Sequence, residues 1–222
     1  MSIANNLISI HEQIAGAAKE SGRAASDINL IAVSKRQSED RIAAALAAGH
    51  RTYGENRVQE AQARWAHRRA DYPDLKLHLI GPLQTNKAAE AVALFDVIEV
   101  LDREKLARAL AKEMRKQNRP LPCFIQVNTG DEDQKSGIAA TDAADFLQFC
   151  RDECALSVSG LMCIPPIDEP AALHFGLLKT LADRLELPNL SMGMSGDFEK
   201  AIPLGATHIR VGTGVFGARD EN

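Results

Sequence analysis

The chain has 222 residues, of which 45% are hydrophobic and 25% are charged. These fractions are ordinary for a folded globular protein and differ from the low hydrophobicity and high charge of disordered chains. The 26 Lys and Arg residues against 30 Asp and Glu residues give a net charge of -4. This balance provides no general attraction to nucleic acid or anionic membranes, so we expect any anion site to be local.

The first residues, 1–13, lack the basic stretch and the apolar run of a secretion signal, and no segment reaches the roughly 18 apolar residues of a membrane span. We therefore expect a cytoplasmic protein that does not bind membranes. The four cysteines form no CxxC pair and have no histidine companion at zinc spacing, so we expect reduced packing cysteines and no metal site. The sequence has no low-complexity linker or repeat, which favours a single domain over residues 1–222.

An amphipathic helix is predicted at about 3–20, because apolar residues recur there at spacings of three and four. The β-branched apolar run 28–33 then predicts a buried strand, with Ser34 and Lys35 at its C-terminal end. A helix capped by Ser38 follows. Further strands are predicted near 51–53, 76–80, 96–101, 123–128, 156–162, 190–192 and 207–211. One of the helices predicted between these strands covers about 84–93. The others are indicated by apolar residues at helical spacing: Val58, Ala61 and Trp65; Leu106, Leu110 and Met114; Phe146 and Phe149; and Leu173, Leu177 and Leu181.

This alternation of strands and helices predicts a parallel sheet covered by helices. Eight strands are enough to close a barrel, although an open doubly wound sheet uses the same repeating unit and is the alternative. We predict an α/β fold consisting of a single (β/α)8 TIM-type barrel with an additional N-terminal helix.

Two glycine-rich loops follow the predicted seventh and eighth strands, where TIM-type barrels commonly bind a phosphate. Residues 193–199 read GMSGDFE and residues 210–217 read RVGTGVFG. Glycines, the hydroxyl groups of Ser195 and Thr213, and free N–H groups at a helix start suit a phosphate. Either loop alone could be a simple turn, but their joint placement favours an anion site. No GxGxxG follows the first strand and no P-loop motif is present.

Lys35 and Arg210 are the candidate reactive and recognition residues. A desolvated lysine at the end of the first strand loses its charge and can form a Schiff base, whereas the alternative is a surface lysine beside an acidic neighbour. Arg210 could face inward beside a ligand or pair with a barrel carboxylate such as Glu55 or Glu99. A lysine, an arginine and a phosphate cradle are together the minimum set of groups for binding pyridoxal 5'-phosphate (PLP).

Other polar residues are expected to be structural. The basic residues in 64–69 surround a single tryptophan and are expected to form an exposed helix face, with no nucleic-acid binding. His78 is expected to be packed and hydrogen-bonded. Lys87 and Lys135 are expected to make solvated charge pairs, with transient cofactor contact as the second interpretation.

Segments along nearly the whole chain match one known family. They are 33–35 (VSK), 53–60 (YGENRVQE), 78–87 (HLIGPLQTNK), 135–137 (KSG), 160–162 (GLM), 193–195 (GMS) and 210–213 (RVGT). In this order they closely resemble the pyridoxal phosphate homeostasis proteins (the YggS/PROSC group). This set of motifs is much more specific than either glycine loop alone.

The resemblance implies one barrel like the N-terminal domain of alanine racemase, with PLP held as an imine on Lys35 and a role in vitamin B6 and amino-acid homeostasis. It assigns the phosphate contacts to Ser195, Gly212 and Thr213. It places Arg210 at the pyridine nitrogen and implies that Asn56 and Met162 are further pocket contacts. The sequence departs from the family pattern at Arg36-Gln37 and at Gly196. These departures can alter the pocket rim, but they remove no group that holds the cofactor.

The residues favour holding PLP over using it. A permanent cation such as Arg210 disfavours protonation of the pyridine nitrogen and weakens the ring as an electron sink. A racemase also needs an acid or base opposite the lysine, and the two tyrosines, Tyr53 and Tyr72, are expected in the core and in a polar loop. We therefore predict that the chain has no catalytic residues. We also expect a monomer that passes PLP to PLP-dependent apoenzymes. The alternatives are a PLP-dependent amino-acid racemase and an aldolase-like barrel that uses Lys35 on a sugar phosphate.

Overall fold

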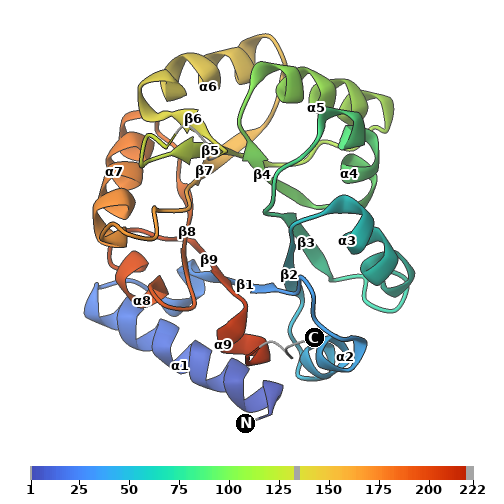
Figure 1. Cartoon of the computed structure of the whole chain (residues 1–222), viewed down its shortest axis with the longest axis vertical. Coiled ribbons are helices and arrows are strands. Elements are labelled where there is room, and N and C mark those ends of the chain that lie inside the picture. Colours follow the sequence, from blue (N-terminus) through green and yellow to red (C-terminus); the bar gives the residue numbers. More distant parts are fainter. Residues whose placement is uncertain (1, 133–135, 219–222) are drawn as a thin grey trace.

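The computed structural model describes residues 2–132 and 136–218. Figure 1 shows a ring of strands surrounded by helices. The strands are β1 (Asn29–Val33), β2 (Thr52–Glu55), β3 (Lys76–Leu79), β4 (Val97–Leu101), β5 (Cys123–Asn128), β6 (Ile138–Ala139), β7 (Val158–Met162), β8 (Asn189–Met194) and β9 (His208–Val211). The helices are α1 (Ile3–Glu20), α2 (Glu39–Ala47), α3 (Val58–Trp65), α4 (Ala88–Leu94), α5 (Glu104–Lys116), α6 (Ala143–Asp152), α7 (Ala171–Arg184), α8 (Phe198–Ala201) and α9 (Thr213–Phe216). No helix in the described residues combines the length and the apolar content needed to cross a bilayer.

The sheet is a closed parallel barrel. Neighbouring strands run in the order β1, β2, β3, β4, β5, β7, β8, β9, and β9 pairs with β1 in parallel, with Ile31 opposite Arg210. The predicted eight-stranded barrel is therefore confirmed and the open doubly wound sheet is excluded. The short strand β6, which the sequence did not reveal, pairs in parallel with the end of β5 and is not one of the eight strands that close the ring.

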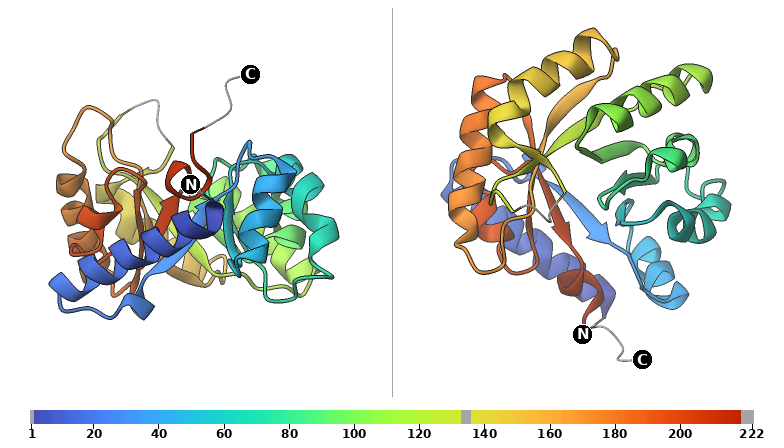
Figure 2. Two further views of the ribbon diagram at one scale, coloured as in Figure 1. Left: turned by 90° about the horizontal axis from the view of Figure 1, so that it is seen from below. Right: turned by 45° about the horizontal axis from the view of Figure 1, so that its top comes forward.

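The additional N-terminal helix α1 lies across the outside of the barrel (Figure 2). Ser2 caps it by accepting a hydrogen bond from the Asn5 N–H at 3.2 Å, and its apolar stripe is buried against α2, α8 and α9. The Asn6 side chain donates to the carbonyl of Val215 at 2.9 Å. This contact ties α1 to α9, the short helix that follows the last strand.

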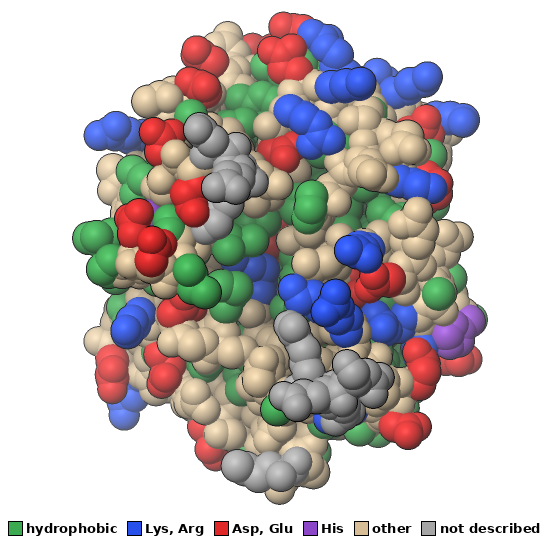
Figure 3. Space-filling model, viewed as in Figure 1, with side chains coloured by type: hydrophobic (Ala, Val, Ile, Leu, Met, Phe, Trp, Pro, Cys, Tyr) green, Lys and Arg blue, Asp and Glu red, His purple; other side chains and the backbone are tan. Residues whose placement is uncertain are grey.

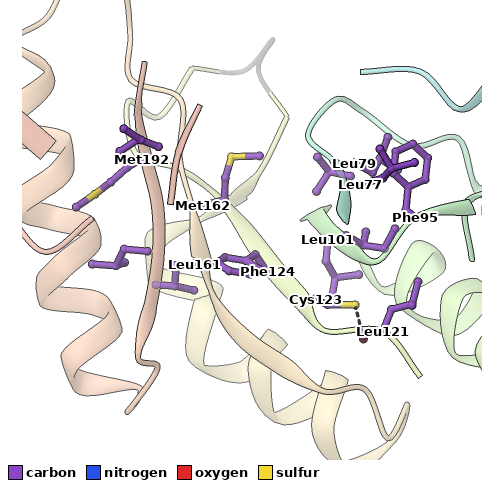
Figure 4. Close-up of a cluster of buried hydrophobic side chains, with 14 of the residues drawn as sticks. Leu77, Leu79, Phe95, Leu101, Leu121, Cys123, Phe124, Leu161, Met162 and Met192 are labelled. Carbon is purple, nitrogen blue, oxygen red and sulfur yellow. Dashed lines mark hydrogen bonds between the residues drawn. The ribbon is translucent and has the colours of Figure 1, made fainter. Parts of the chain in front are cut away.

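The apolar core lies mainly between the strands and the helices. Figure 4 shows Leu77 and Leu79 of β3 next to Phe95, and all three are fully buried. Because alternate residues of a strand point to opposite sides, the intervening His78 points into the barrel. There it meets Glu99, which is also buried. The barrel interior therefore carries a polar cluster, while the outer layer supplies most of the hydrophobic packing.

Helix α7 is confirmed, but its buried face differs from the predicted one. Leu173 is 67% exposed and Leu177 is 42% exposed, whereas Phe175 and Leu178 are fully buried. Two apolar stripes with helical spacing run along this helix, and periodicity alone does not decide between them. Because Phe175 brings the larger apolar side chain, its stripe packs on the barrel. Leu173 and Leu177 face solvent, whereas Leu181, the third predicted residue, is partly buried against the core.

Candidate functional site

A cavity of about 310 Å³ opens at the carboxyl ends of β1, β8 and β9. The predicted site residues that line it are Lys35, Asn56, Ser195, Arg210, Gly212 and Thr213. Figure 3, which has the same view as Figure 1, shows Lys and Arg side chains gathered near the centre of this face of the molecule. The fold therefore brings together the predicted lysine, the predicted arginine and both glycine-rich loops.

Lys35 reaches the cavity because strand pairing continues almost to it. The Ser34 N–H donates to the carbonyl of Gly54 at 3.1 Å, so Lys35 follows the last paired residue of the first strand. The chain then turns at Arg36, whose φ of 58° lies in the left-handed region. This turn carries Gln37 back to the cavity wall, where it is buried.

A buried carboxylate fixes the chain on both sides of Lys35. Oε1 of Glu55 accepts hydrogen bonds from Ser34 Oγ at 2.7 Å and from Arg64 Nη1 at 2.7 Å. Arg64 also donates to the carbonyl of Gln37 at 3.3 Å. Through Arg64, helix α3 is thereby linked to both sides of Lys35. It contacts Ser34 indirectly, by way of the Glu55 carboxylate, and it contacts Gln37 directly.

The expected exposed basic face at 64–69 is wrong for its three arginines, although His67 is exposed. The side chains of Arg64 and Arg68 are each only 13% exposed, and Arg69 donates to the carboxylate of Asp96 at 2.7 Å. The physical reason is that a buried carboxylate such as Glu55 requires a cationic partner. These arginines fold inward to meet carboxylates and do not present a stripe of charge to solvent.

The C-terminal end of β8 needs glycine at one position. Gly193 has a φ of 93°, and a Cβ there would lie 2.7 Å from Cβ of Ala201. Gly196, in contrast, has open space around its missing side chain. The departure from the family pattern at Gly196 is therefore not required by packing.

Ser195 connects the two glycine-rich loops. Its Oγ accepts a hydrogen bond from the Gly214 N–H at 3.3 Å, in the first turn of α9. The hydroxyl proton of Ser195 can then be donated to a ligand. The N–H of Thr213, the first residue of α9, lies at the cavity wall and can also donate to a ligand.

Arg210 lies on β9 and lines the cavity, and it is only 4% exposed. Its Nη1 donates to Ser191 Oγ at 2.6 Å and its Nη2 donates to the carbonyl of Cys163 at 2.7 Å. Ser191 Oγ donates in turn to Oε2 of Glu99 at 2.6 Å. The two predicted alternatives for Arg210 are thus combined, since it faces the cavity and reaches the Glu99 carboxylate through a serine.

Glu99 is held as a buried anion. Burial alone raises its pKa, but the hydrogen bond from Nδ1 of His78 at 2.6 Å and the charges of His78 and Arg210 outweigh burial and lower the pKa below its ordinary value. His78 is 5% exposed, and its expected role as a packed, hydrogen-bonded histidine is confirmed.

Asn56 and Met162 have different positions relative to the cavity. Asn56 lines it, and its buried Oδ1 has no hydrogen-bond partner among the described residues. A Cβ at Gly81 would lie 2.5 Å from the carbonyl oxygen of Asn56, so this glycine allows the close approach of the two loops. Met162 is fully buried opposite Ser191 in the strand register and is not among the residues that line the cavity.

Neither tyrosine is placed to transfer protons in the cavity. Tyr53 is fully buried, its hydroxyl donates to the carbonyl of His50 at 3.1 Å, and burial raises its pKa. Tyr72 precedes β3, so it lies at the opposite end of the barrel from the cavity. Lys87 pairs with Glu90 at 3.1 Å, as expected.

The remaining candidate groups are Lys135, the cysteines and any cluster that could hold a metal. Lys135 lies outside the described residues, so its expected charge pair stays a prediction. The cysteines are free and buried. Within residues 2–132 and 136–218, no three His, Cys, Asp or Glu side chains are grouped as a metal site.

Sequence reasoning missed the groups that support the site. Ser191 and the Cys163 carbonyl hold Arg210, while Gln37 and Ile80 line the cavity. A polar residue at an inward position of an apolar strand is the one signal that could have revealed Ser191. A backbone carbonyl leaves no such signal in a sequence.

The comparisons with known proteins agree with this geometry. The model of the family "Alanine racemase, N-terminal domain" matches residues 12–220. The pyridoxal phosphate homeostasis protein of Vibrio cholerae is 40% identical over 229 residues, which cover 99% of this chain and 97% of that protein.

Two solved structures are also similar. PipY of Synechococcus elongatus PCC7942, solved with PLP bound, is 37% identical with a TM-score of 0.85, over 97% of this chain and 100% of that chain. Alanine racemase of Clostridium difficile 630 is 11% identical with a TM-score of 0.73, and the match covers 100% of this chain and 58% of that chain, which shows a shared fold. By the family model and the full-length similarity to curated members, this chain belongs to the pyridoxal phosphate homeostasis protein family.

Proposed function

We propose that this protein binds PLP as an imine on Lys35 and acts in vitamin B6 and amino-acid homeostasis by holding the cofactor. The observation that carries the proposal is that Lys35, Arg210 and the Ser195 loop line one cavity. The names of the V. cholerae relative and of the PLP-bound PipY structure support it.

The residues of the cavity fit this cofactor. The Ser195 hydroxyl, the Gly212 backbone and Thr213 form an anion-binding wall that suits the phosphate. Two hydrogen bonds hold Arg210, and its guanidinium has five donors in all, so donors remain for the pyridine nitrogen side of the ring. Asn56 brings a buried amide oxygen without a partner among the described residues. Met162 is fully buried opposite Ser191 in the strand register.

These residues favour holding over catalysis. Bound PLP supplies an electron sink, and this sink is strong only when the pyridine nitrogen is protonated. The permanent charge of Arg210 opposes that protonation. Tyr53 and Tyr72, the two tyrosines of the chain, lie away from the cavity. The barrel therefore has the groups that retain a cofactor and lacks the tyrosine that could serve as a second acid or base.

We further propose that residues 1–222 form one PLP-binding domain that acts in the cytoplasm as a monomer and passes PLP to PLP-dependent apoenzymes. The continuous barrel and the family match over residues 12–220 support one domain. The reduced, buried cysteines suit a reducing compartment. Light scattering of the purified protein and transfer of its cofactor to an added apoenzyme test the assembly state and the recipient.

An absorbance spectrum with borohydride trapping tests the central proposal. The purified protein should be yellow, and reduction should attach the cofactor to a peptide that contains Lys35. Lys35→Ala should lose both signals. A colourless protein that traps a sugar phosphate instead would contradict the proposal and favour an aldolase-like barrel.

The absence of turnover is tested separately. The protein loaded with PLP is incubated with single enantiomers of amino acids in deuterated water, and exchange at Cα is followed. We expect no sustained exchange. Exchange that continues over many turnovers and depends on Lys35 would identify a racemase or a related enzyme.

A further inference from the structure

We propose that Ser191 and Glu99 are positioning residues for Arg210, which fix its guanidinium at the cavity floor and balance its charge next to the bound cofactor. The inference rests on the proposed function, because Arg210 meets a cofactor ring only if PLP occupies the cavity. It concerns two residues that do not line the cavity themselves.

The first argument is the direction of the hydrogen bonds. A guanidinium only donates, so Ser191 Oγ must accept from Arg210 Nη1 at 2.6 Å. The single hydroxyl proton of Ser191 is then donated to Oε2 of Glu99 at 2.6 Å. Each bond has one possible direction, and both are short. The orientation of Arg210 is therefore coupled to a carboxylate on the opposite side of the barrel, on β4.

The second argument is charge. Glu99 is 0% exposed and Arg210 is 4% exposed, so solvent screens neither charge. His78 contacts Oε1 of Glu99, and Ser191 links Oε2 of the same carboxylate to Arg210. The groups that face Glu99 are His78 from β3, Ser191 from β8, and His208 and Arg210 from β9. Burial lowers the pKa of His208 to about 4, so this histidine is neutral near pH 7. Glu99 is therefore the buried anion that balances Arg210.

Two substitutions can separate the position of the Arg210 guanidinium from the balance of its charge. Ser191→Ala removes the acceptor that holds Nη1, while the charge of Glu99 remains. Glu99→Gln retains an amide oxygen that can accept from Ser191, while the negative charge is lost. A role in positioning and balancing Arg210 thus predicts different effects for the two substitutions, whereas a role in packing alone predicts only a loss of stability.

We expect Ser191→Ala to weaken PLP binding about tenfold, which corresponds to one lost hydrogen bond to a charged group. We expect Glu99→Gln to move the spectroscopic pH titration of the Lys35 imine to lower pH. The cause is that the unbalanced guanidinium disfavours a second positive charge in the cavity. Ser191 is the hydrogen-bonded link between Glu99 and Arg210. Any weakening of PLP binding by Glu99→Gln that arises from a displaced guanidinium should therefore be smaller when Ser191 is already alanine.

The experiment uses the full chain stripped of cofactor and titrated with PLP. Dissociation constants, the midpoints of the spectral pH titrations and thermal melting are measured for the wild type, both variants and the double variant. Ser159→Ala is the matched control, because Ser159 lies on the neighbouring strand β7 and its hydroxyl donates to the carbonyl of Cys123 at 3.4 Å, away from Arg210. This control should leave binding and midpoint unchanged.

The possible outcomes separate this inference from the proposed function. If the wild type gives no PLP spectrum, the proposed function fails and the inference fails with it. If the wild type binds PLP through Lys35 but Ser191→Ala and Glu99→Gln bind and titrate like the wild type, only the positioning role is overturned. Lower melting temperatures with unchanged binding and midpoint also overturn it. Should Glu99→Gln not fold, the affinity of Ser191→Ala decides the matter.

Discussion

Arg64 on α3 donates a 2.7 Å hydrogen bond to the fully buried carboxylate of Glu55 at the end of β2. The same carboxylate oxygen accepts from Ser34, the residue before Lys35. A residue pair that lies outside the cavity therefore holds the chain segment that presents the lysine. Lys35 is therefore placed by a helix and two strands together and not by its own loop alone.

Arg64→Ala should strongly destabilise the protein, because it leaves Glu55 buried without its cationic partner. We expect a loss of about 3 to 5 kcal/mol in the free energy of unfolding, measured by urea denaturation. The control is Arg57→Ala, since Arg57 is 71% exposed and pairs with Glu60 at the surface. This control should cost less than about 1 kcal/mol. Equal stability of the two variants would show that the buried pair does not anchor the segment.

Gly193→Ala should destabilise the C-terminal end of β8, whereas Gly176→Ala should not destabilise α7. At Gly193 a Cβ would meet both an unfavourable φ of 93° and the side chain of Ala201 at 2.7 Å. At Gly176 a Cβ has open space within a helix, where alanine is favoured by up to about 1 kcal/mol. Thermal melting of the two variants should move in opposite directions from the wild type. A Gly193→Ala protein as stable as the wild type would contradict the packing described here.

The stability should fall between neutral pH and pH 5. Burial lowers the pKa of His50 and of His208 from 6.5 to about 4, so the unfolded chain binds more protons than the native state in this interval. The stabilisation from each neutral histidine is complete above pH 6.5 and is lost as the pH falls towards 4. At pH 5 the loss amounts to about 2 kcal/mol for each histidine.

Urea unfolding at pH 7 and pH 5 measures this difference. His50→Gln should reduce it, because glutamine does not titrate in this range. A free energy of unfolding that stays constant or rises on acidification would show that these two histidines are not buried in the neutral form.

The thiols should react slowly in the native protein. Cys123, Cys150 and Cys163 are buried, and burial raises the pKa of each thiol to about 12. Very little thiolate is then present at neutral pH. Ellman's reagent should label the native protein slowly and should find four thiols after unfolding in denaturant. Rapid labelling of the native state, or fewer than four thiols after unfolding, would contradict this prediction.

Much of the fold could be predicted from local patterns. The apolar run that ends at Ser34 and Lys35 placed the first strand and its end, and the two glycine-rich segments near the ends of β8 and β9 indicated the side of the barrel on which the cavity opens. These features are local because strand ends and tight turns are encoded by neighbouring residues. Closure of the barrel could not be derived from these patterns alone, because an open doubly wound sheet uses the same repeating unit.

Contacts between distant segments could not be predicted in the same way. The hydrogen bond from Arg210 to the Cys163 carbonyl joins residues 47 positions apart, and the inward turn of Arg64 depends on a carboxylate on another element. The buried face of α7 depended on which of two apolar stripes met the barrel. In each case the decisive partner is set by tertiary packing and leaves no periodic signal.

The hydrogen bond that joins α1 to α9 has a consequence for biosynthesis. Asn6 and Val215 are separated by 209 positions, and β9 completes the ring by pairing with β1. Translation delivers the N-terminal segments first. A polypeptide still emerging from the ribosome therefore lacks Arg210 and Thr213, and cofactor capture has to wait until the final strand has been released and has joined the first.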